Sequence, residues 1–309
     1  MIEITDALTN ICGRENVYLN EPMMKHTSFR IGGPADWFVS PGNIPALRET
    51  IDFLKATEIP YFILGNGSNL LVSDEGYRGV VIQIGKNMSE IEISGTRVRA
   101  QAGALLSSVS SRAAAASLTG MEFAGGIPGS IGGACVMNAG AYGGEMKDIL
   151  KSVTALYGDG SVRKVPCEEL MLGYRSSALM KNGAIVLEAE ISLAEGDTAE
   201  IRRTMDDLRE RRVSKQPLEL PSAGSTFKRP EGYFAGKLIM DCGLRGFSVG
   251  GAQVSEKHCG FVVNRGGATA DDVMMLIRYI QKTVLDTFGV ELVPEVRFLG
   301  EFKSRECGT

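Results

Sequence analysis

The sequence lacks the features that mark membrane, exported and metal-binding proteins. Within its 309 residues, no stretch reaches the roughly 18 apolar residues of a membrane span. The opening MIEITDALTN shows no basic region followed by an apolar run, as a secretory signal would. The six cysteines are widely spaced without a C-x-x-C pair, and no histidine cluster has metal-ligand spacing. We therefore expect a cytoplasmic protein with reduced thiols and no metal site.

The charge and composition exclude further classes of protein. A net charge of -4 gives no reason to expect nucleic acid as a partner. With 44% hydrophobic and 23% charged residues, the chain has the composition of a globular protein, and it shows no internal repeat or low-complexity tract. At about 150 residues per domain, its length predicts two domains or three small ones.

Two common nucleotide-binding fingerprints are also absent. The run Gly65-Asn66-Gly67 imitates the start of G-x-G-x-x-G, but position 70 is leucine and the run LLV at 70–72 favours a strand. The pair Gly236-Lys237 is followed by leucine, so the serine or threonine of a P-loop is missing. What remains is a tight turn after a strand, with polar side chains that could contact a ligand.

The strongest positive feature is a glycine-rich segment, residues 122–145, EFAGGIPGSIGGACVMNAGAYGGE. We expect no ordinary helix or strand to tolerate this glycine density. Glycines let the backbone approach a bulky ligand, and successive backbone N–H groups form concavities that bind phosphate. Interspersed apolar residues such as Ile127 and Ile131 indicate a packed loop. The segment predicts a pyrophosphate cradle.

Apolar periodicity and turn residues predict the remaining elements. Helices are expected at 44–56, 104–118 with Gly120 as the cap, 198–213 with a cap at Asp197 or Thr198, 234–242, and 270–288 ended by Gly289. Strands are expected at 36–39, 59–64, 91–102, 152–157, 162–165 and 185–193. Three prolines at 217, 221 and 230 mark a domain boundary, a place where ligand sites often form.

Seven motifs in order resemble the UDP-N-acetylenolpyruvoylglucosamine reductase (MurB) family, in its short branch without the extra tyrosine loop. They are HTSFRIGG (26–33), GNGSNLL (65–71), GIPGSIGGA (126–134), NAGAYG (138–143), GYRSS (173–177), PSAGSTFKRP (221–230) and PEVRFLG (294–300). The resemblance implies an α+β fold with a vanillyl-alcohol-oxidase/PCMH-type FAD-binding domain and a C-terminal substrate domain. The implied divisions are 1–84 joined by 297–309, 85–214, and 215–296.

The resemblance also implies the reaction and its partners. NADPH reduces non-covalent FAD, which passes hydride to the enolpyruvyl group of UDP-N-acetylglucosamine enolpyruvate. The product is UDP-N-acetylmuramate, a peptidoglycan precursor. Ser225 is implied as the proton donor, and Arg175 and Glu295 as the residues that polarise the substrate and stabilise developing charge. A fixed guanidinium suits a carboxylate in such a step. Without the resemblance, Ser225 would be a turn hydroxyl, and the other two would be surface or ion-pair residues.

The implied contacts form two sets. Expected cofactor contacts are Gly65, Asn66, Gly67, Ser68, Asn69, Leu70, Gly126, Ile127, Pro128, Gly129, Ser130, Gly132, Gly133, Ala134, Asn138, Gly140, Ala141 and Tyr142. We expect a valine at Gly129 or Gly132 to fill space that FAD needs. Weaker candidates for the UDP-sugar are Lys215, Lys228, Arg229, Tyr233 and Lys237. We expect a monomer without nucleic acid or membrane partners.

Three alternatives stay open. His26 is either a flavin attachment point or base, or a structural residue of a polar loop. The protein could instead be a flavin oxidase or dehydrogenase of the same fold, which would not require PSAGSTF and PEVRF together. A non-catalytic nucleotide-binding module is the third possibility. Aerobic against anaerobic turnover separates the oxidase from the reductase.

Overall fold

The computed structural model describes residues 2–302, which form two compact units. The first unit comprises the chain up to Tyr18, Trp37–Asn66 and Val80–Arg212. The second comprises Leu19–Asp36, Gly67–Gly79 and the chain from Val213 onward. The three-part division drawn from the family resemblance stays a prediction. Among the described residues, no helix combines the length and apolarity needed to cross a membrane.

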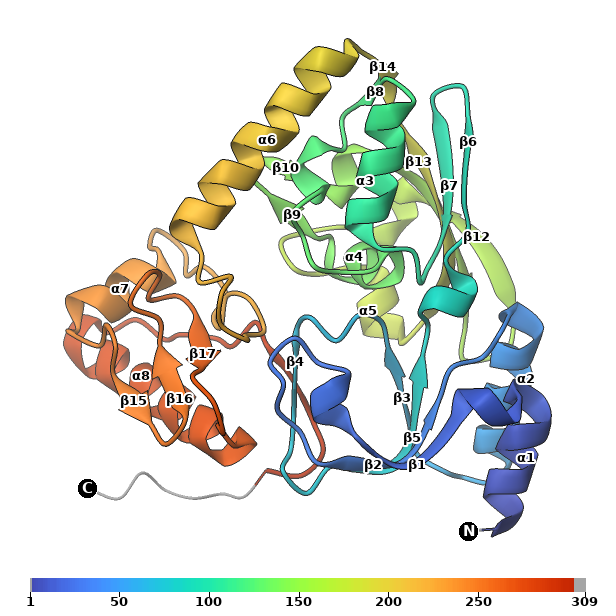
Figure 1. The fold of residues 1–309 in the computed structure, drawn as a ribbon, viewed down its shortest axis with the longest axis horizontal. Helices are drawn as coiled ribbons and strands as arrows, with labels where there is room; N and C mark the ends of the chain where they lie inside the picture. The colour runs from blue at the N-terminus through green and yellow to red at the C-terminus, as the bar shows by residue number, and fades with distance from the viewer. Residues whose placement is uncertain (1, 303–309) are drawn as a thin grey trace. The chain divides into compact units, whose positions relative to one another are not determined.

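A five-stranded antiparallel sheet forms the centre of the first unit (Figure 1). Its strand order is β12 (Val162–Pro166), β11 (Leu150–Leu156), β13 (Ile185–Ser192), β7 (Arg97–Gln101) and β6 (Ile91–Ser94). The predicted strands at 152–157 and 162–165 form a hairpin through the turn Gly158-Asp159-Gly160, because Leu156 pairs with Val162. Inside that turn, the Asp159 carboxylate accepts a 2.9 Å hydrogen bond from the Ser161 N–H.

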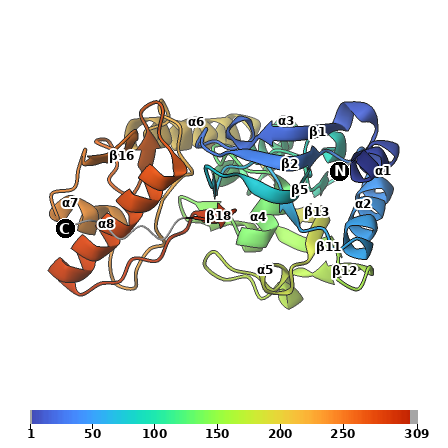
Figure 2. The same cartoon turned by 90° about the horizontal axis from the view of Figure 1, so that it is seen from below.

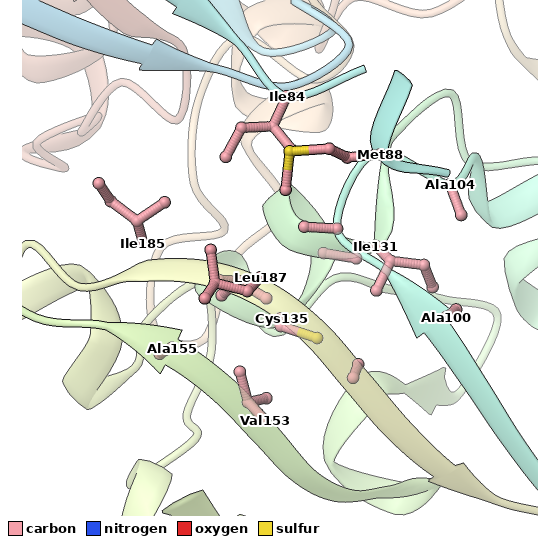
Figure 3. Close-up of a cluster of buried hydrophobic side chains, with 14 of the residues drawn as sticks. Ile84, Met88, Ala100, Ala104, Ile131, Cys135, Val153, Ala155, Ile185 and Leu187 are labelled. Carbon is pink, nitrogen blue, oxygen red and sulfur yellow. The ribbon is translucent and has the colours of Figure 1, made fainter. Parts of the chain in front are cut away.

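Helix α4 (Ile131–Met137) packs against β13 and β7 of this sheet. Figure 3 shows Ile131 and Cys135 of the helix among Ala100, Val153 and Leu187 of the sheet. These five side chains are all buried, so the apolar positions of the glycine-rich segment belong to the main hydrophobic core. The core therefore holds one side of the segment in place.

Helices α1 (Ile2–Cys12) and α2 (Ile44–Ala56) lie side by side in the same unit (Figure 2). The predicted bounds of α2 are confirmed, and Asn43 caps it by accepting from the Ala46 N–H. Strand β3 (Tyr61–Leu64) follows α2 and pairs in parallel with β5 (Tyr77–Gln83). A βαβ-like connection thus delivers the chain to the turn that begins at Gly65.

The second unit has its own core around α8 (Ala270–Phe288). This helix packs against α7 (Ala235–Asp241) and against β15 (Ser248–Val249) and β16 (Ala252–Val254), which continue into β17 (Val262–Asn264). A capping box of Thr269 and Asp272 begins α8, and Gly289 at a φ of 67° ends it. Strand β4 (Leu70–Val72) pairs in parallel with β18 (Arg297–Leu299).

Shorter elements complete the two units. Strands β1 (Val17–Pro22), β2 (Pro34–Val39) and β5, with helix α6 (Thr198–Lys215), have residues in both units, and the three strands share a sheet of order β1-β2-β5-β3. The others are α3 (Leu106–Ala115), α5 (Ala178–Asn182), β8 (Leu118–Thr119), β9 (Gly140–Ala141), β10 (Gly144–Glu145), β14 (Ala194–Glu195) and the 3₁₀ turns η1 (Arg14–Asn16), η2 (Met23–Lys25), η3 (Lys86–Met88), η4 (Glu122–Ala124), η5 (Met146–Asp148) and η6 (Cys167–Leu170).

Two local expectations are wrong. The glycine-rich segment is not free of helix, because α4 contains Gly132 and Gly133. A β-carbon added at Gly132 would lie 3.0 Å from the Ala102 β-carbon, so the glycine lets α4 approach β7 closely. Gly120 does not cap α3, which already ends at Ala115 with Ala116 as its C-cap, followed by Ser117 in the left-handed region at a φ of 58°. Short strand β8 follows where the helix was expected to continue.

Candidate functional site

Two parts of the predicted cofactor set, the pair Gly65-Asn66 and the glycine-rich segment, lie side by side in the first unit. The Asn66 Nδ2 atom donates a 3.0 Å hydrogen bond to the Pro128 carbonyl. A β-carbon added at Gly65 would lie 2.6 Å from the Ser130 Oγ atom, so only glycine fits this close approach. The structure therefore brings the turn after β3 against the glycine-rich segment, as a shared ligand site requires.

The backbone between Gly126 and Gly132 is held by the first residue of α3 and by the residues just before it. Leu106 N–H donates to the Gly129 carbonyl over 3.0 Å, and Ile131 N–H donates to the Ala104 carbonyl over 2.8 Å. Within residues 2–302, no acceptor is recorded for the backbone N–H groups of Gly126 and Ser130. A fixed backbone that carries spare N–H donors is suited to bind an anion such as pyrophosphate.

The glycines of this region serve different purposes. At Gly126, an added β-carbon would approach Arg212. At Gly132 it would meet Ala102, so the expectation that this position leaves space for FAD is replaced by close protein packing. At Gly133 the nearest atom is the Ser130 Oγ at 3.7 Å, which is an ordinary contact on an exposed residue. Gly133 is therefore the glycine with room for a ligand.

The end of the glycine-rich segment holds the turn that carries Arg175. The Asn138 side chain is fully buried and donates to the Glu145 carboxylate over 2.7 Å and to the Gly173 carbonyl over 3.1 Å. Gly173 and Ser176 pair with each other and enclose Tyr174 and Arg175 in a tight turn. The Asn138 amide is thus engaged with protein partners, and a cofactor contact by this residue stays a prediction.

Arg175 and Tyr142 occupy strained backbone positions in this unit. Arg175 has a φ of 52° and Tyr142 a φ of 55°, in the left-handed region that non-glycine residues seldom adopt. Arg175 is half-buried, with its guanidinium carbon 5.1 Å from the centre of the Tyr174 ring. Tyr142 lies at the tip between β9 and β10 and is exposed. Such strain is often found at functional sites.

Ser225 and Glu295 lie on neighbouring segments of the second unit. Glu295 N–H donates to the Thr226 carbonyl over 2.8 Å, and Phe227 pairs with Pro294. On the other side, Thr226 N–H donates to the Gly260 carbonyl over 2.8 Å, and its buried hydroxyl accepts from the Val262 N–H over 2.9 Å. The backbone beside Ser225 is therefore fixed from both sides, while the Ser225 side chain itself is exposed.

Asn69 of the predicted cofactor set belongs to this second group. Its Nδ2 atom donates to the Glu295 carbonyl over 3.1 Å, and its own carbonyl accepts from the Arg297 N–H. The structure thus brings together Asn69, Ser225 and Glu295 in the second unit, and Arg175 with the glycine-rich segment in the first. The catalytic roles of Arg175, Ser225 and Glu295 stay predictions.

The other residues of the GNGSNLL motif are held by protein contacts. Gly67 has a φ of 60°, and an added β-carbon would overlap the His26 carbonyl. Its own carbonyl accepts from the Ser28 N–H over 3.1 Å. Leu70 is buried in β4, and Ser68 is half-buried. His26, at the end of η2, lies with its Nε2 atom 3.0 Å from the carboxylate of Glu21 in β1.

The predicted substrate residues all belong to the second unit, where several contact other side chains. Lys237 forms a 2.7 Å ion pair with Asp241. The Arg229 guanidinium lies 4.0 Å from the centre of the Phe234 ring. Lys215 and Tyr233 are exposed and Lys228 is half-buried. An exposed aromatic beside basic residues is suitable for a nucleotide, but their substrate contact stays a prediction.

Five cysteines are free thiols, and Cys307 lies outside the described residues. Burial raises the pKa of the Cys135 thiol to about 12. Because the thiolate is the reactive form, Cys135 acts as a core residue. Among residues 2–302, no group of three or more acidic, histidine or cysteine side chains is placed to hold a metal ion.

Sequence reasoning missed one charged residue at the glycine-rich segment. Arg212 is half-buried near the end of α6, with its Cδ and Nη1 atoms 3.0 Å and 3.3 Å from the position of a β-carbon on Gly126. Its neighbours in the charge-rich run 200–211 have the pattern of a solvated helix face. The sequence therefore gives no sign that Arg212 differs from them. The different environment of Arg212 becomes visible only in the fold.

Comparisons with known proteins agree with this division of features. A family model described as an FAD binding domain matches residues 35–166, which include both glycine motifs. A model for the C-terminal domain of UDP-N-acetylenolpyruvoylglucosamine reductase matches residues 216–299, which include Ser225 and Glu295. The predicted fold class is confirmed by these matches and by the likeness to the solved Thermus caldophilus structure.

Relatives match across nearly the whole chain. The UDP-N-acetylenolpyruvoylglucosamine reductase of Agathobacter rectalis is 57% identical, covering 92% of this chain and 94% of its own. The reductase of Clostridioides difficile is 54% identical, and the match covers 95% of this chain and 97% of that protein. The crystal structure of the Thermus caldophilus enzyme is 38% identical with a TM-score of 0.78, covering 92% and 98%. On these grounds, the chain belongs to the UDP-N-acetylenolpyruvoylglucosamine reductase family.

Proposed function

We propose that the protein is an NADPH-dependent, FAD-containing reductase of UDP-N-acetylglucosamine enolpyruvate that forms UDP-N-acetylmuramate for peptidoglycan synthesis. The observation that carries this proposal is the combination of two features in one chain. A glycine-built backbone site lies within the FAD-domain match, and Ser225 and Glu295 lie on paired segments within the reductase-domain match. An oxidase of the same fold would need only the first.

The residues of the first unit fit FAD. Gly133 leaves room for close approach of a ligand, and the N–H groups of Gly126 and Ser130 are available to its phosphates. When bound, FAD supplies hydride transfer from NADPH to the carbon–carbon double bond of the substrate. The polypeptide must bind the substrate, orient it against the flavin and donate a proton to it.

Arg175 is proposed to bind the substrate carboxylate. Addition of hydride to one carbon of an enolpyruvyl group leaves negative charge on the adjacent carbon and its carboxylate. A guanidinium can make two parallel hydrogen bonds to such a carboxylate, and a preorganised charge stabilises the transition state more than the ground state. The tight turn tied to Asn138 is suited to fix this arginine.

Ser225 is proposed to hold the proton that completes the reduction. A serine hydroxyl is a weak acid, so its value as a donor depends on position, and positioned proton transfer typically contributes about 10²- to 10⁴-fold. The Thr226 contacts to Gly260, Val262 and Glu295 supply this positioning. Glu295, half-buried and bonded through its backbone to Thr226 and Asn69, is proposed to orient the substrate and the donor.

We also infer that the enzyme acts as a cytoplasmic monomer on a UDP-sugar. Lys215, Lys228, Arg229, Tyr233 and Lys237 are proposed as its contacts to the nucleotide, because a diphosphate and a uracil ring call for cations and an aromatic surface. Light scattering at micromolar concentration tests the monomer, and a stable dimer would contradict it.

The proposed reaction is tested by product analysis under anaerobic and aerobic conditions. Purified protein, NADPH and UDP-N-acetylglucosamine enolpyruvate should give one UDP-N-acetylmuramate per NADPH, with the same yield in both atmospheres. Hydrogen peroxide formation that replaces product in air would favour the flavin oxidase. Protein that remains colourless after reconstitution with FAD would exclude both.

A further inference from the structure

Arg212 has an environment unlike the other arginines of α6. Its Cδ and Nη1 atoms lie close to Gly126, and the residue is half-buried. By contrast, Arg211 is exposed and forms a 2.9 Å ion pair with Asp207. Burial lowers the pKa of Arg212, and the nearby Tyr142 hydroxyl has the opposite, smaller effect. Arg212 is therefore partly removed from water beside Gly126, near the start of the glycine-rich segment.

No carboxylate neutralises this charge within the part of the chain that the structure describes. The ion pairs of residues 2–302 include none from Arg212. A desolvated charge without a partner destabilises a folded protein, and such charges are normally paired or bound to a ligand. The guanidinium thus needs an anion that the polypeptide does not supply.

The surroundings select the kind of anion. Gly126 is exposed, its N–H has no recorded acceptor among the described residues, and lack of a side chain there leaves the guanidinium beside the open backbone. Backbone N–H donors next to a guanidinium are suited to phosphate oxygens. We propose that Arg212 is the positive partner of a ligand diphosphate bound against Gly126, an inference that rests on the proposed function for the identity of that ligand.

Two ligands of the proposed reaction contain a diphosphate, FAD and the UDP-sugar. The shared chemistry is a pair of phosphates bound by one guanidinium and adjacent N–H groups. Because Gly126 and the Gly65 turn lie together in the first unit, we expect FAD to be the ligand. Separate binding titrations with FAD and with UDP distinguish the two sources.

The test uses the full-length protein stripped of flavin, with Arg212→Met, Arg212→Lys and the control Arg211→Met. Fluorescence titration with FAD should show about 10- to 100-fold weaker binding for Arg212→Met, since a hydrogen bond to a charged group is worth about 1.5–3 kcal/mol. The FAD affinity of Arg212→Lys should lie between those of the wild type and Arg212→Met, because lysine keeps the positive charge but lacks the paired N–H donors of the guanidinium. Arg211→Met should bind FAD like the wild type.

Riboflavin and UDP complete the test. Riboflavin, which has no phosphate, should bind Arg212→Met and wild type equally. If FAD binding is unchanged and UDP binding falls, the diphosphate belongs to the substrate and the assignment of Arg212 to a diphosphate holds. Unchanged affinity for both FAD and UDP, or an equal loss for riboflavin and FAD, would overturn it. Failure of the wild type to bind FAD would instead contradict the proposed function.

Stability of the flavin-free protein provides an independent readout. Arg212→Met should raise its melting temperature relative to wild type, because methionine removes an unpaired, partly desolvated charge and keeps the aliphatic packing. With saturating FAD, the wild type should have the higher melting temperature, since its tighter FAD binding stabilises it more than the variant. A merely structural arginine would give a lower melting temperature for the variant in both states.

Discussion

The two groups of site residues are built in opposite ways. In the first unit, the site consists largely of glycine backbone, and the absence of side chains at Gly65 and Gly126 makes room for the neighbouring Ser130 and Arg212 side chains. In the second unit, Ser225 and Glu295 are common side chains on segments held by ladder-like hydrogen bonds through Thr226. A backbone site is visible in a sequence as an unusual composition. A side-chain site of common residues needs its context to be identified.

The largest expected effect comes from Ser225→Ala. Rapid mixing without oxygen should show flavin reduction by NADPH at the wild-type rate. Reoxidation by the enolpyruvyl substrate should slow by about 10²- to 10⁴-fold, because the positioned proton donor is gone. Equal slowing of both half-reactions would show that Ser225 supports the fold. It would also remove the difference proposed between the glycine site of the first unit and the side-chain site of the second.

A pair of neighbouring glycines separates packing from ligand contact. Gly132→Val should destabilise the protein by about 1–3 kcal/mol through overpacking, since its side chain would meet Ala102. Gly133→Ala has room and should leave unfolding by urea unchanged or slightly improved, while FAD binds more weakly. If Gly133→Ala retains full FAD affinity, the glycine-rich segment is not the ligand surface at that point.

Thr226→Val sharpens the account of the second unit. The Thr226 hydroxyl accepts from the Val262 N–H inside the core, so valine leaves that donor unsatisfied at a cost of about 1–3 kcal/mol. Thr226→Ser keeps the acceptor and serves as the control. We expect Thr226→Val to slow substrate-driven reoxidation while NADPH-driven reduction stays near the wild-type rate. A loss confined to stability would mean that Thr226 does not position Ser225.

Much of the regular structure could be predicted because local signals and packing agree. The sequence of α8 shows its apolar face and both ends, and Thr269 and Gly289 form the observed caps. Helix α4 could not be predicted, because its two glycines disfavour helix locally, and the close contact of Gly132 with Ala102 is visible only in the fold. In this case the sheet outweighs the intrinsic propensity.

The same limit applies to the site residues. The glycines at 65 and 126 stand out in the sequence and do line one region, but Gly67 serves contact with the His26 backbone. Arg212 could not be distinguished from Arg211 by sequence, because both belong to a charged helix and their burial differs only in the fold. Ser225 and Glu295, 70 residues apart, are neighbours through backbone pairing that no local pattern encodes.

The smallest effect is a pH dependence of stability in the second unit. The His258 Nδ1 atom accepts a 3.0 Å hydrogen bond from the Gly260 N–H, and burial lowers the pKa of His258 below 6.5. Well above pH 6.5 the ring is neutral in both the folded and the unfolded chain. As pH falls below 6.5 the unfolded chain binds the proton first, so the free energy of unfolding should decrease.

Urea unfolding between pH 7 and pH 5 measures this decrease. His258→Asn removes the ionisation and offers an oxygen acceptor in place of Nδ1, so part of the acid sensitivity should disappear with little change at pH 7. Identical pH profiles for the two proteins would contradict the environment assigned to His258.

The most direct measurement of the central claim is the flavin spectrum of the wild-type protein through one anaerobic cycle. Addition of NADPH should bleach the visible absorption of bound FAD, and a single equivalent of UDP-N-acetylglucosamine enolpyruvate should restore it with formation of UDP-N-acetylmuramate. Bleached flavin that is reoxidised by oxygen but not by this substrate would contradict the proposed reductase.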